Sequence, residues 1–182
     1  MHPEILVKLR GIILTDFAEG EPITFASLKS CRYLQHFLNE VLRLHPTVPL
    51  NSRLAVNDTT LPVGGGSDQR SPIAIRKGET VIYSVYFMHR RTDLWGPDAL
   101  TFNPSRWEGS KHSWQFLPFS GGPRICIGQQ FALTEASFVL VKILLAFDRV
   151  EAVDAVDLAK LNKKMGVTMP PKDVKVRLHR AA

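Results

Sequence analysis

Cysteine is scarce in this sequence, which contains only Cys31 and Cys126 among its 182 residues. Two cysteines supply neither a disulfide framework nor a four-ligand zinc site. They could still pair with each other, and a reduced cytosolic environment fits the count equally well. Apolar runs are short as well: no run reaches the roughly 18 residues of a membrane span, and the start, MHPEILVKLR, lacks the apolar core of a signal peptide. We therefore predict that the chain, which shows no anchor of its own, is not an integral membrane protein.

Acidic residues are outnumbered, since 23 basic and 17 acidic side chains leave a net charge of +6. Hydrophobic content of 45% and charged content of 22% are ordinary for a globular protein, and the length suits one domain. The basic excess near the C-terminus indicates a solvated face or, alternatively, a surface that docks an acidic protein or a membrane. No base-stacking aromatic residues are interleaved with it, so we expect no nucleic-acid partner. The basic residues are Lys160, Lys163, Lys164, Lys172, Lys175, Arg177 and Arg180, with only Asp173 among them.

The stretch 116–131, FLPFSGGPRICIGQQF, places Cys126 among glycines and directly before a long apolar run. A lone cysteine is most often a small buried hydrophobe. In this stretch, however, Gly121, Gly122 and Gly128 leave the backbone room to approach a flat ligand, because no Cβ stands in the way. The apolar run predicts a helix, and the amide groups at its N-terminal edge would favour a thiolate at Cys126. A thiolate is a strong ligand for iron.

Five positions of this stretch together resemble the haem-binding loop of the cytochrome P450 family, phenylalanine-x-x-glycine-x-arginine-x-cysteine-x-glycine. They are Phe119, Gly122, Arg124, Cys126 and Gly128. The resemblance implies that Cys126 is the axial ligand of the iron in haem b and that the other four positions belong to the cofactor-binding loop. Arg124 adds a planar, permanently charged fork that suits a haem propionate.

Residues 24–45 predict a long helix, with Thr24 as its N-cap and Pro46 disfavouring helical geometry just beyond its end. Its apolar stripe is Cys31, Leu34, Leu38, Val41 and Leu42. Glu40 and Arg43 stand at positions i and i+3 away from that stripe, a spacing that by itself predicts an exposed ion pair contributing less than about 1 kcal/mol. The resemblance instead identifies them as the glutamate-x-x-arginine pair of the family's K helix.

The tract 103–107, Asn-Pro-Ser-Arg-Trp, resembles the family's proline-glutamate-arginine-phenylalanine motif. The resemblance implies that Arg106 meets Glu40 and Arg43, so that one carboxylate bridges two guanidinium groups. Ser105 stands where the motif has glutamate, which puts the local loop contacts in question but not the arginine. Breaking a buried network of this kind at one member costs about 3–5 kcal/mol, so its expected role is to fix the loop beneath the haem rather than to do chemistry.

The remaining patterns complete an α+β chain, mainly α with a small β region, which resembles the C-terminal part of the cytochrome P450 fold. A first helix is predicted from Pro3, and strands are predicted at Leu61–Val63, Ile73–Arg76 and Thr80–Phe87 with glycine-containing turns between them. By the resemblance, residues 1–182 form one partial domain with the following parts: a K helix (24–45), a β region (50–88), a meander and haem loop (89–128), an L helix (127–147) and a C-terminal hairpin (165–180).

Further site residues are candidates by resemblance alone. Arg53 occupies the position of a second propionate ligand, and the alternative is a solvated strand arginine. In the family, the extended segment after the K helix lines the substrate pocket and a C-terminal turn touches substrate. A core-filling role suits Met169 equally well. The substrate candidates are Val48, Pro49, Leu50, Thr168 and Met169.

The resemblance implies a haem-thiolate monooxygenase, an oxidoreductase that inserts one oxygen atom of O2 into an aliphatic substrate. Stretches 50–53, 89–93 and 128–135 look like those of fungal alkane and fatty-acid terminal hydroxylases, which implies a small hydrophobic substrate. Electrons would come from NADPH through NADPH-cytochrome P450 reductase, docked on the basic side. Full-length members of the family lie at the endoplasmic reticulum membrane, whereas a chain without an anchor would be cytosolic or peripheral.

A second hypothesis is a truncated, non-catalytic fragment with weak or no haem binding. The sequence contains no alanine/glycine-glycine-x-aspartate/glutamate-threonine segment, which in the family delivers protons to iron-bound oxygen. The chain would then hold one half of a haem site without the other. In addition, residues 131–147 are apolar on nearly every side, and such a helix belongs in the middle of a larger protein.

Overall fold

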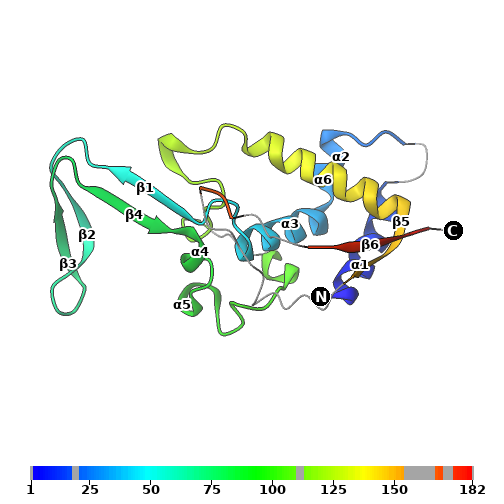
Figure 1. The fold of residues 1–182 in the computed structure, drawn as a ribbon, viewed down its shortest axis with the longest axis horizontal. Coiled ribbons are helices and arrows are strands. Elements are labelled where there is room, and N and C mark those ends of the chain that lie inside the picture. Colours follow the sequence, from blue (N-terminus) through cyan, green and yellow to red (C-terminus); the bar gives the residue numbers. More distant parts are fainter. Residues whose placement is uncertain (1, 18–20, 110–112, 154–166, 170–173, 182) are drawn as a thin grey trace.

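The computed structural model describes residues 2–17, 21–109, 113–153, 167–169 and 174–181. Its elements are α1 (Pro3–Asp16), α2 (Phe25–Ser30), α3 (Arg32–Leu44), β1 (Leu50–Leu54), β2 (Thr59–Gly65), β3 (Ser71–Ile75), β4 (Thr80–Ser84), α4 (Val85–Met88), α5 (Thr92–Trp95), η1 (Pro104–Trp107), η2 (Gly122–Arg124), α6 (Gln129–Ala146), β5 (Phe147–Ala152) and β6 (Val176–Arg180). The long helices gather at one end, and a narrow arm of strands extends from the other (Figure 1). These helices and small sheets confirm the predicted α+β class.

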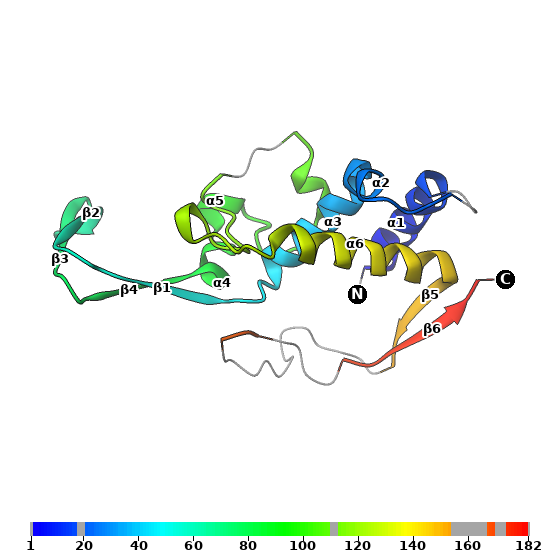
Figure 2. The same ribbon diagram turned by 90° about the horizontal axis from the view of Figure 1, so that it is seen from above.

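The hydrophobic core lies where α1, α2, α3 and α6 pack together (Figure 2). Its buried members are Leu9, Ile13, Phe17, Leu28, Cys31, Leu34, Val141 and Leu144. Cys31 is therefore a core residue, whereas Cys126 is exposed, and both are free thiols. The disulfide that the sequence left open does not form.

The predicted helix over residues 24–45 is two helices that meet at Cys31. Thr24 caps the first one: its hydroxyl accepts a hydrogen bond from the Ser27 N–H (3.1 Å), and the Ser27 hydroxyl accepts one from the Thr24 N–H (3.0 Å). At Cys31 the backbone leaves helical geometry, with ψ at 87°. The bend lets α2 and α3 direct Leu28 and Leu34 into the same core cluster, and this tertiary gain outweighs the continuous helical pattern of the sequence.

The β region is an arm built from two two-stranded antiparallel sheets, the second of which is a hairpin inserted in the chain between the strands of the first. β1 pairs with β4 in antiparallel register from Leu50↔Ser84 to Leu54↔Thr80, and β2 pairs with β3. The β2–β3 hairpin lies at the far end of the arm, away from the helices (Figure 1). The strand predicted over Thr80–Phe87 ends earlier, because the Ser84 hydroxyl accepts the Phe87 N–H (3.2 Å) and starts α4.

The C-terminal strand pairs differently from the predicted hairpin over residues 165–180. β6 pairs antiparallel with β5, which directly continues α6, and does not pair with residues 167–169. The backbone N–H of Met169 instead donates to the carbonyl of Thr47 (2.8 Å). The β5 strand offers β6 a longer edge of backbone hydrogen-bonding groups than a three-residue run does. Residues 170–173, like Lys160, Lys163 and Lys164, lie outside the described part of the chain.

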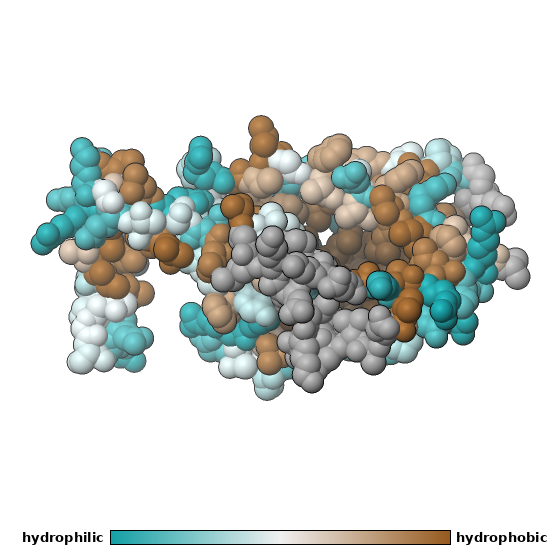
Figure 3. Space-filling view, in the orientation of Figure 1, coloured by the Kyte–Doolittle hydropathy of each residue, from teal (hydrophilic) through white to brown (hydrophobic). Residues whose placement is uncertain are grey.

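The long helix α6 buries little of its apolar surface. Only Ser137, Val141 and Leu144 are buried, on the side that packs against α1, α2 and α3. Phe131 is 73% exposed, and apolar side chains lie over this region on the face in Figure 3. By length and composition α6 could cross a membrane, which corrects the expectation that no segment reaches that length. One such helix is weak evidence, because the core helix of a soluble protein passes the same test.

Candidate haem-binding site

Helix α3 carries Glu40 and Arg43 on one buried face. The distances from Arg43 Nε to Glu40 Oε2 and from Arg43 Nη2 to Glu40 Oε1 are both 2.8 Å, and neither side chain is exposed. The short helix η1 places Arg106 Nε 3.4 Å from Glu40 Oε1. The structure thus brings the three predicted triad residues together around one carboxylate, inside the protein rather than on its surface.

Backbone carbonyls complete the surroundings of Arg43. Its Nη1 donates to the carbonyls of His89 (2.8 Å) and Ala99 (2.6 Å), and its Nη2 donates to the carbonyl of Thr101 (3.2 Å). A guanidinium has five N–H donors in a fixed plane, so these contacts hold the following meander segment at a set angle to α3. The hydrogen bonds of Arg43 therefore attach α3 to the segment that leads to the Cys126 loop.

The carboxylate of Glu40 stays charged although it has no solvent contact. Burial alone would raise the pKa of Glu40, but hydrogen bonds from Arg43, from the Asn103 backbone N–H (2.9 Å) and from the Trp107 indole N–H (3.1 Å) outweigh it and hold the pKa below its usual value. A buried charge with this many donors is costly to disturb.

Sequence reasoning missed a second acid at Arg106, the half-exposed Asp98. Arg106 Nη2 lies 2.7 Å from Asp98 Oδ2, and Arg106 Nη1 lies 3.1 Å from Asp98 Oδ1. This two-point contact, first of all its hydrogen bonds, lowers the pKa of Asp98. Arg106 is thus held between Glu40 and Asp98. The two residues are eight positions apart in the tract 93–107, a separation that matches no helix or strand period, so no sequence pattern indicates this contact.

The loop that carries Cys126 folds back on itself before α6 begins. The Cys126 N–H donates to the carbonyl of Phe119 (2.9 Å), and the Ile125 N–H donates to the carbonyl of Gly122 (3.1 Å). Gly122 has φ of +69°, a conformation that favours glycine. Gly128 is the N-cap residue of α6, so Cys126 stands just outside the helix end rather than in its first turn.

The surroundings of the Cys126 thiol are open and apolar. Cys126 is exposed, and so are Ile125 and Ile127, the latter completely. A Cβ built on Gly128 would lie 3.8 Å from the Cys126 sulfur, so glycine at this position keeps one side of the sulfur free. The loop therefore presents a thiol together with apolar side chains, without a covering element among the described residues.

Arg53 reaches from β1 to the same loop. Its Nη2 donates to the Ser120 hydroxyl (2.9 Å), and the Tyr83 hydroxyl lies 3.1 Å from that oxygen. The guanidinium carbon lies 5.6 Å from the centre of the Tyr83 ring. Within the described part of the chain, Arg53 has no carboxylate partner, and neither does Arg124. Two guanidinium groups without acids thus belong to the segments around Cys126.

The predicted substrate residues come from two segments that touch through their backbones. Pro49 is buried, Leu50 is 43% exposed and Val48 lies between these extremes. Thr168 is exposed and Met169 half-buried. The hydrogen bond from the Met169 N–H to Thr47 joins the two segments, which sequence reasoning did not predict.

A family model described as cytochrome P450 matches residues 1–178 of this chain. The chain belongs to the cytochrome P450 family. It is 59% identical to "Cytochrome P450 monooxygenase g430" of Fusarium sp over 150 residues, which cover 81% of this chain and 26% of that protein. It is 51% identical to "Cytochrome P450 52E1" of Candida apicola (84% and 30% covered) and 55% identical to "Cytochrome P450 52A5" of Candida maltosa (80% and 29% covered). The chain therefore spans less than a third of the length of these curated relatives.

Membership of the cytochrome P450 family implies a haem cofactor, and the residues around Cys126 fit one. In the cytochrome P450 family, haem has a cysteine thiolate as axial ligand, and it also needs cations for its two carboxylates and an apolar surface for its ring. The exposed Cys126 thiol, the guanidinium groups without acids and exposed side chains such as Ile127 and Phe131 supply these three kinds of contact.

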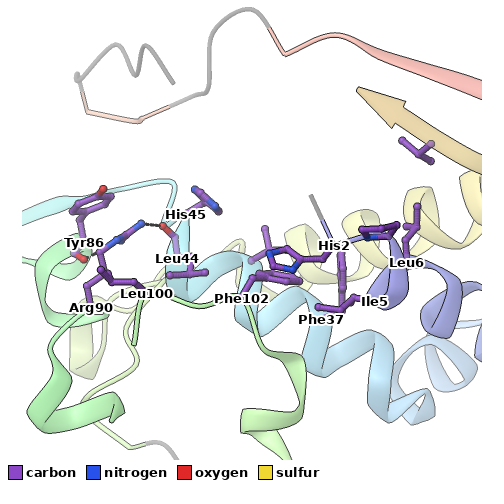
Figure 4. Close-up of a pocket in the computed structure, with 13 residues that line it drawn as sticks. His2, Ile5, Leu6, Phe37, Leu44, His45, Tyr86, Arg90, Leu100 and Phe102 are labelled. Atoms are coloured by element: carbon purple, nitrogen blue, oxygen red, sulfur yellow. Dashed lines mark hydrogen bonds between the residues drawn. The ribbon is translucent and has the colours of Figure 1, made fainter. Parts of the chain in front are cut away.

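A cavity of about 550 Å³ lies elsewhere, between α1, α3, α4 and β5. Figure 4 shows Arg90 reaching toward Leu44 at one end of it, His2 beside Phe102 near the middle, and Leu6 toward the other end. None of the residues predicted for the haem or the substrate lines this cavity. It is therefore separate from the Cys126 loop.

Proposed function

We propose that this chain forms the cysteine-bearing side of a haem-thiolate monooxygenase that acts on an aliphatic substrate, an alkane or a fatty acid. The observation that carries the proposal is an exposed Cys126 thiol in a backbone-bonded loop that also contains Arg124 and that Arg53 reaches through Ser120; neither arginine has a carboxylate partner among the described residues. Haem b, when bound, supplies activation of O2 and insertion of one oxygen atom into a C–H bond.

The residues of the chain have separate roles in this proposal. Cys126 holds the iron, and Arg53 and Arg124 hold the propionates. Phe119, Gly122 and Gly128 shape the loop, since the Phe119 carbonyl fixes the Cys126 backbone and the two glycines give the loop its turn and its open side. Glu40, Arg43 and Arg106 fix the meander beneath the loop. Val48, Pro49, Leu50, Thr168 and Met169 border the substrate.

The proposals for an aliphatic substrate, for the source of electrons and for the location are based on the similarity to the relatives. The two Candida relatives described above carry names that begin with "Cytochrome P450 52", and the stretches around residues 50–53 and 128–135 resemble fungal alkane and fatty-acid hydroxylases. Electrons are proposed to come from NADPH through NADPH-cytochrome P450 reductase. The endoplasmic reticulum membrane is the proposed location of the full-length enzyme.

A second candidate is a polypeptide that holds haem weakly or not at all and does no chemistry. The exposure of α6 favours it, because Phe131, Phe138 and Val139 are 73%, 42% and 49% exposed on a helix of apolar composition. A soluble protein rarely leaves such a surface uncovered, so the site would then be incomplete without another polypeptide segment.

An absorption spectrum of the haem-loaded chain, reduced under carbon monoxide, distinguishes the two candidates. The chain should show a thiolate-type Soret band that Cys126→Ala loses and Cys31→Ala keeps, because Cys31 lies in the core and far from solvent. Absence of any Cys126-dependent band would reject the proposed site and favour the second candidate. Loss of the band in both variants would mean that the band reports folding rather than ligation.

A further inference from the structure

His89 connects the helix of the Glu40–Arg43 pair to the segment that leads to Cys126. It directly follows α4, and its side chain has no exposed surface. Its ring Nδ1 lies 3.2 Å from the backbone carbonyl oxygen of Arg43, and its ring Nε2 lies 2.9 Å from the backbone nitrogen of Leu117. One side chain thus bonds to two segments that are far apart in the sequence.

These two partners determine which ring nitrogen carries the proton. The Leu117 N–H can only donate, so Nε2 must be the unprotonated acceptor. The Arg43 carbonyl can only accept, so Nδ1 must carry the hydrogen. Burial first, and then the neighbouring cations Arg43 and Arg90, lower the pKa of His89 to about 4, and this keeps the ring neutral near pH 7.

Aromatic side chains hold the ring of His89 in this orientation. The ring centroid of Phe116 lies 5.2 Å from that of His89, and Trp95 approaches edge-on at 6.1 Å. Phe116 also packs against Trp107, with 4.5 Å between centroids. The imidazole therefore has little freedom to leave either hydrogen bond.

From Leu117, short backbone bonds continue to the cysteine. The Ser120 N–H donates to the carbonyl of Leu117 (3.2 Å), and the Cys126 N–H donates to the carbonyl of Phe119 (2.9 Å). We propose that His89 is a positioning residue that sets the Cys126 loop relative to α3 through its Nε2 contact with Leu117. What the loop does once positioned rests on the function proposed above, but the positioning itself does not.

Two substitutions separate the two hydrogen bonds of His89. An asparagine amide reaches the place of Nδ1, and a glutamine amide reaches the place of Nε2, so His89→Asn keeps only the contact with Arg43 and His89→Gln keeps an acceptor for Leu117. Amide hydrogen exchange of the haem-free full chain at pH 7 then reports the result. We expect about tenfold less protection at Leu117 and Cys126 in His89→Asn, and less than about threefold change in His89→Gln.

The proposal is overturned if both variants lose protection at Leu117 and Cys126 equally, if neither loses it, or if the loss is uniform over the chain, including Val141 in the core. Should either variant fail to fold, ¹⁵N resonances of the unsubstituted chain decide: His89 must be the Nδ1–H tautomer, and the other tautomer rejects the contact with Leu117. Haem takes no part in these measurements. Their outcome is therefore independent of whether Cys126 binds iron.

Discussion

The carboxylate of Glu40 accepts two hydrogen bonds, each 2.8 Å long, from the guanidinium of Arg43. The two residues lie about one turn apart on α3, and neither side chain is exposed to solvent. The pair is the local centre of the fold, because Arg43 then bonds to carbonyls of the meander and Glu40 receives Arg106 and the Trp107 indole. The arrangement leaves no access for substrate to either side chain, which agrees with a structural role.

Removing one charge of this pair should destabilise the protein strongly. In Glu40→Gln the buried Arg43 guanidinium loses its counter-ion, and we expect a loss of about 3–5 kcal/mol in the free energy of unfolding. Urea denaturation followed by circular dichroism measures it. The matched control is Asp93→Asn, which breaks an ion pair with Arg91 that is about 60% exposed on both sides and should leave the free energy of unfolding almost unchanged, because water and salt screen such a pair. Similar losses of unfolding free energy in both variants would show that burial does not determine how much the Glu40–Arg43 pair contributes to stability.

Acid should weaken the fold in a window set by His89. Its pKa is about 4 in the folded protein against 6.5 for an unperturbed histidine, so the unfolded chain binds more protons between these values. The stability is fully present above pH 6.5 and should fall by up to about 3 kcal/mol as the pH drops toward 4. His89→Gln, which does not titrate, should lose less stability over the same interval. The free energy of unfolding is measured by denaturation at a series of pH values. If it falls equally with pH in the unsubstituted protein and in His89→Gln, the pH dependence does not come from His89.

Glu40 and Asp98, whose pKa values are lowered in the folded protein, should affect stability at more acidic pH than His89 does. Their contribution is present above their unperturbed values of 4.5 and 3.8 and is lost as the pH falls through the folded values. A second acid transition, retained in His89→Gln, should therefore follow the first. Its absence below pH 4 would mean that these carboxylates are not held by their arginines.

The two cysteines should react with thiol reagents at very different rates. Cys126 is exposed, whereas Cys31 is 2% exposed, and its burial first of all raises its pKa to about 11. At pH 7.5 a maleimide should label Cys126 faster by on the order of 100-fold, and Cys31 only after denaturation. Mass spectrometry of the labelled peptides identifies the site. Equal labelling of both would contradict the packing of α2 and α3.

Two glycine-to-alanine substitutions should change the free energy of unfolding in opposite directions. Gly11 lies within α1, and a Cβ there meets nothing within 4 Å, so Gly11→Ala should raise the unfolding free energy by about 0.5–1 kcal/mol. Gly122 has φ of +69°, and Gly122→Ala should lower it by about 1–2 kcal/mol through backbone strain. Thermal denaturation of both variants checks the pair, and a stabilising Gly122→Ala would disprove the left-handed turn at that residue.

The sequence by itself determined the family, the α+β class and the approximate positions of several helices and strands. The Cys126 loop motif and the Glu40–Arg43 spacing lie within short stretches, where each residue type acts on near neighbours in the chain. The strands predicted at Leu61–Val63 and Ile73–Arg76 coincide with parts of β2 and β3, although β2 continues to Gly65, inside the predicted glycine turn; like the helix after Gly128, they follow from turn residues and local periodicity. Such patterns need no knowledge of what lies across the molecule.

Only the tertiary structure decided which side chains meet and which are buried. The polar face of α3 looked exposed by its spacing, yet Glu40 is buried because residues 99–107 pack over it. The Asp98 contact with Arg106, the pairing of β5 with β6 and the bond from His89 to Leu117 join segments that no helical or strand period relates. His89 and Arg43 are 46 residues apart. Contacts at that separation depend on how whole elements pack, and the energy of that packing is not contained in any local stretch.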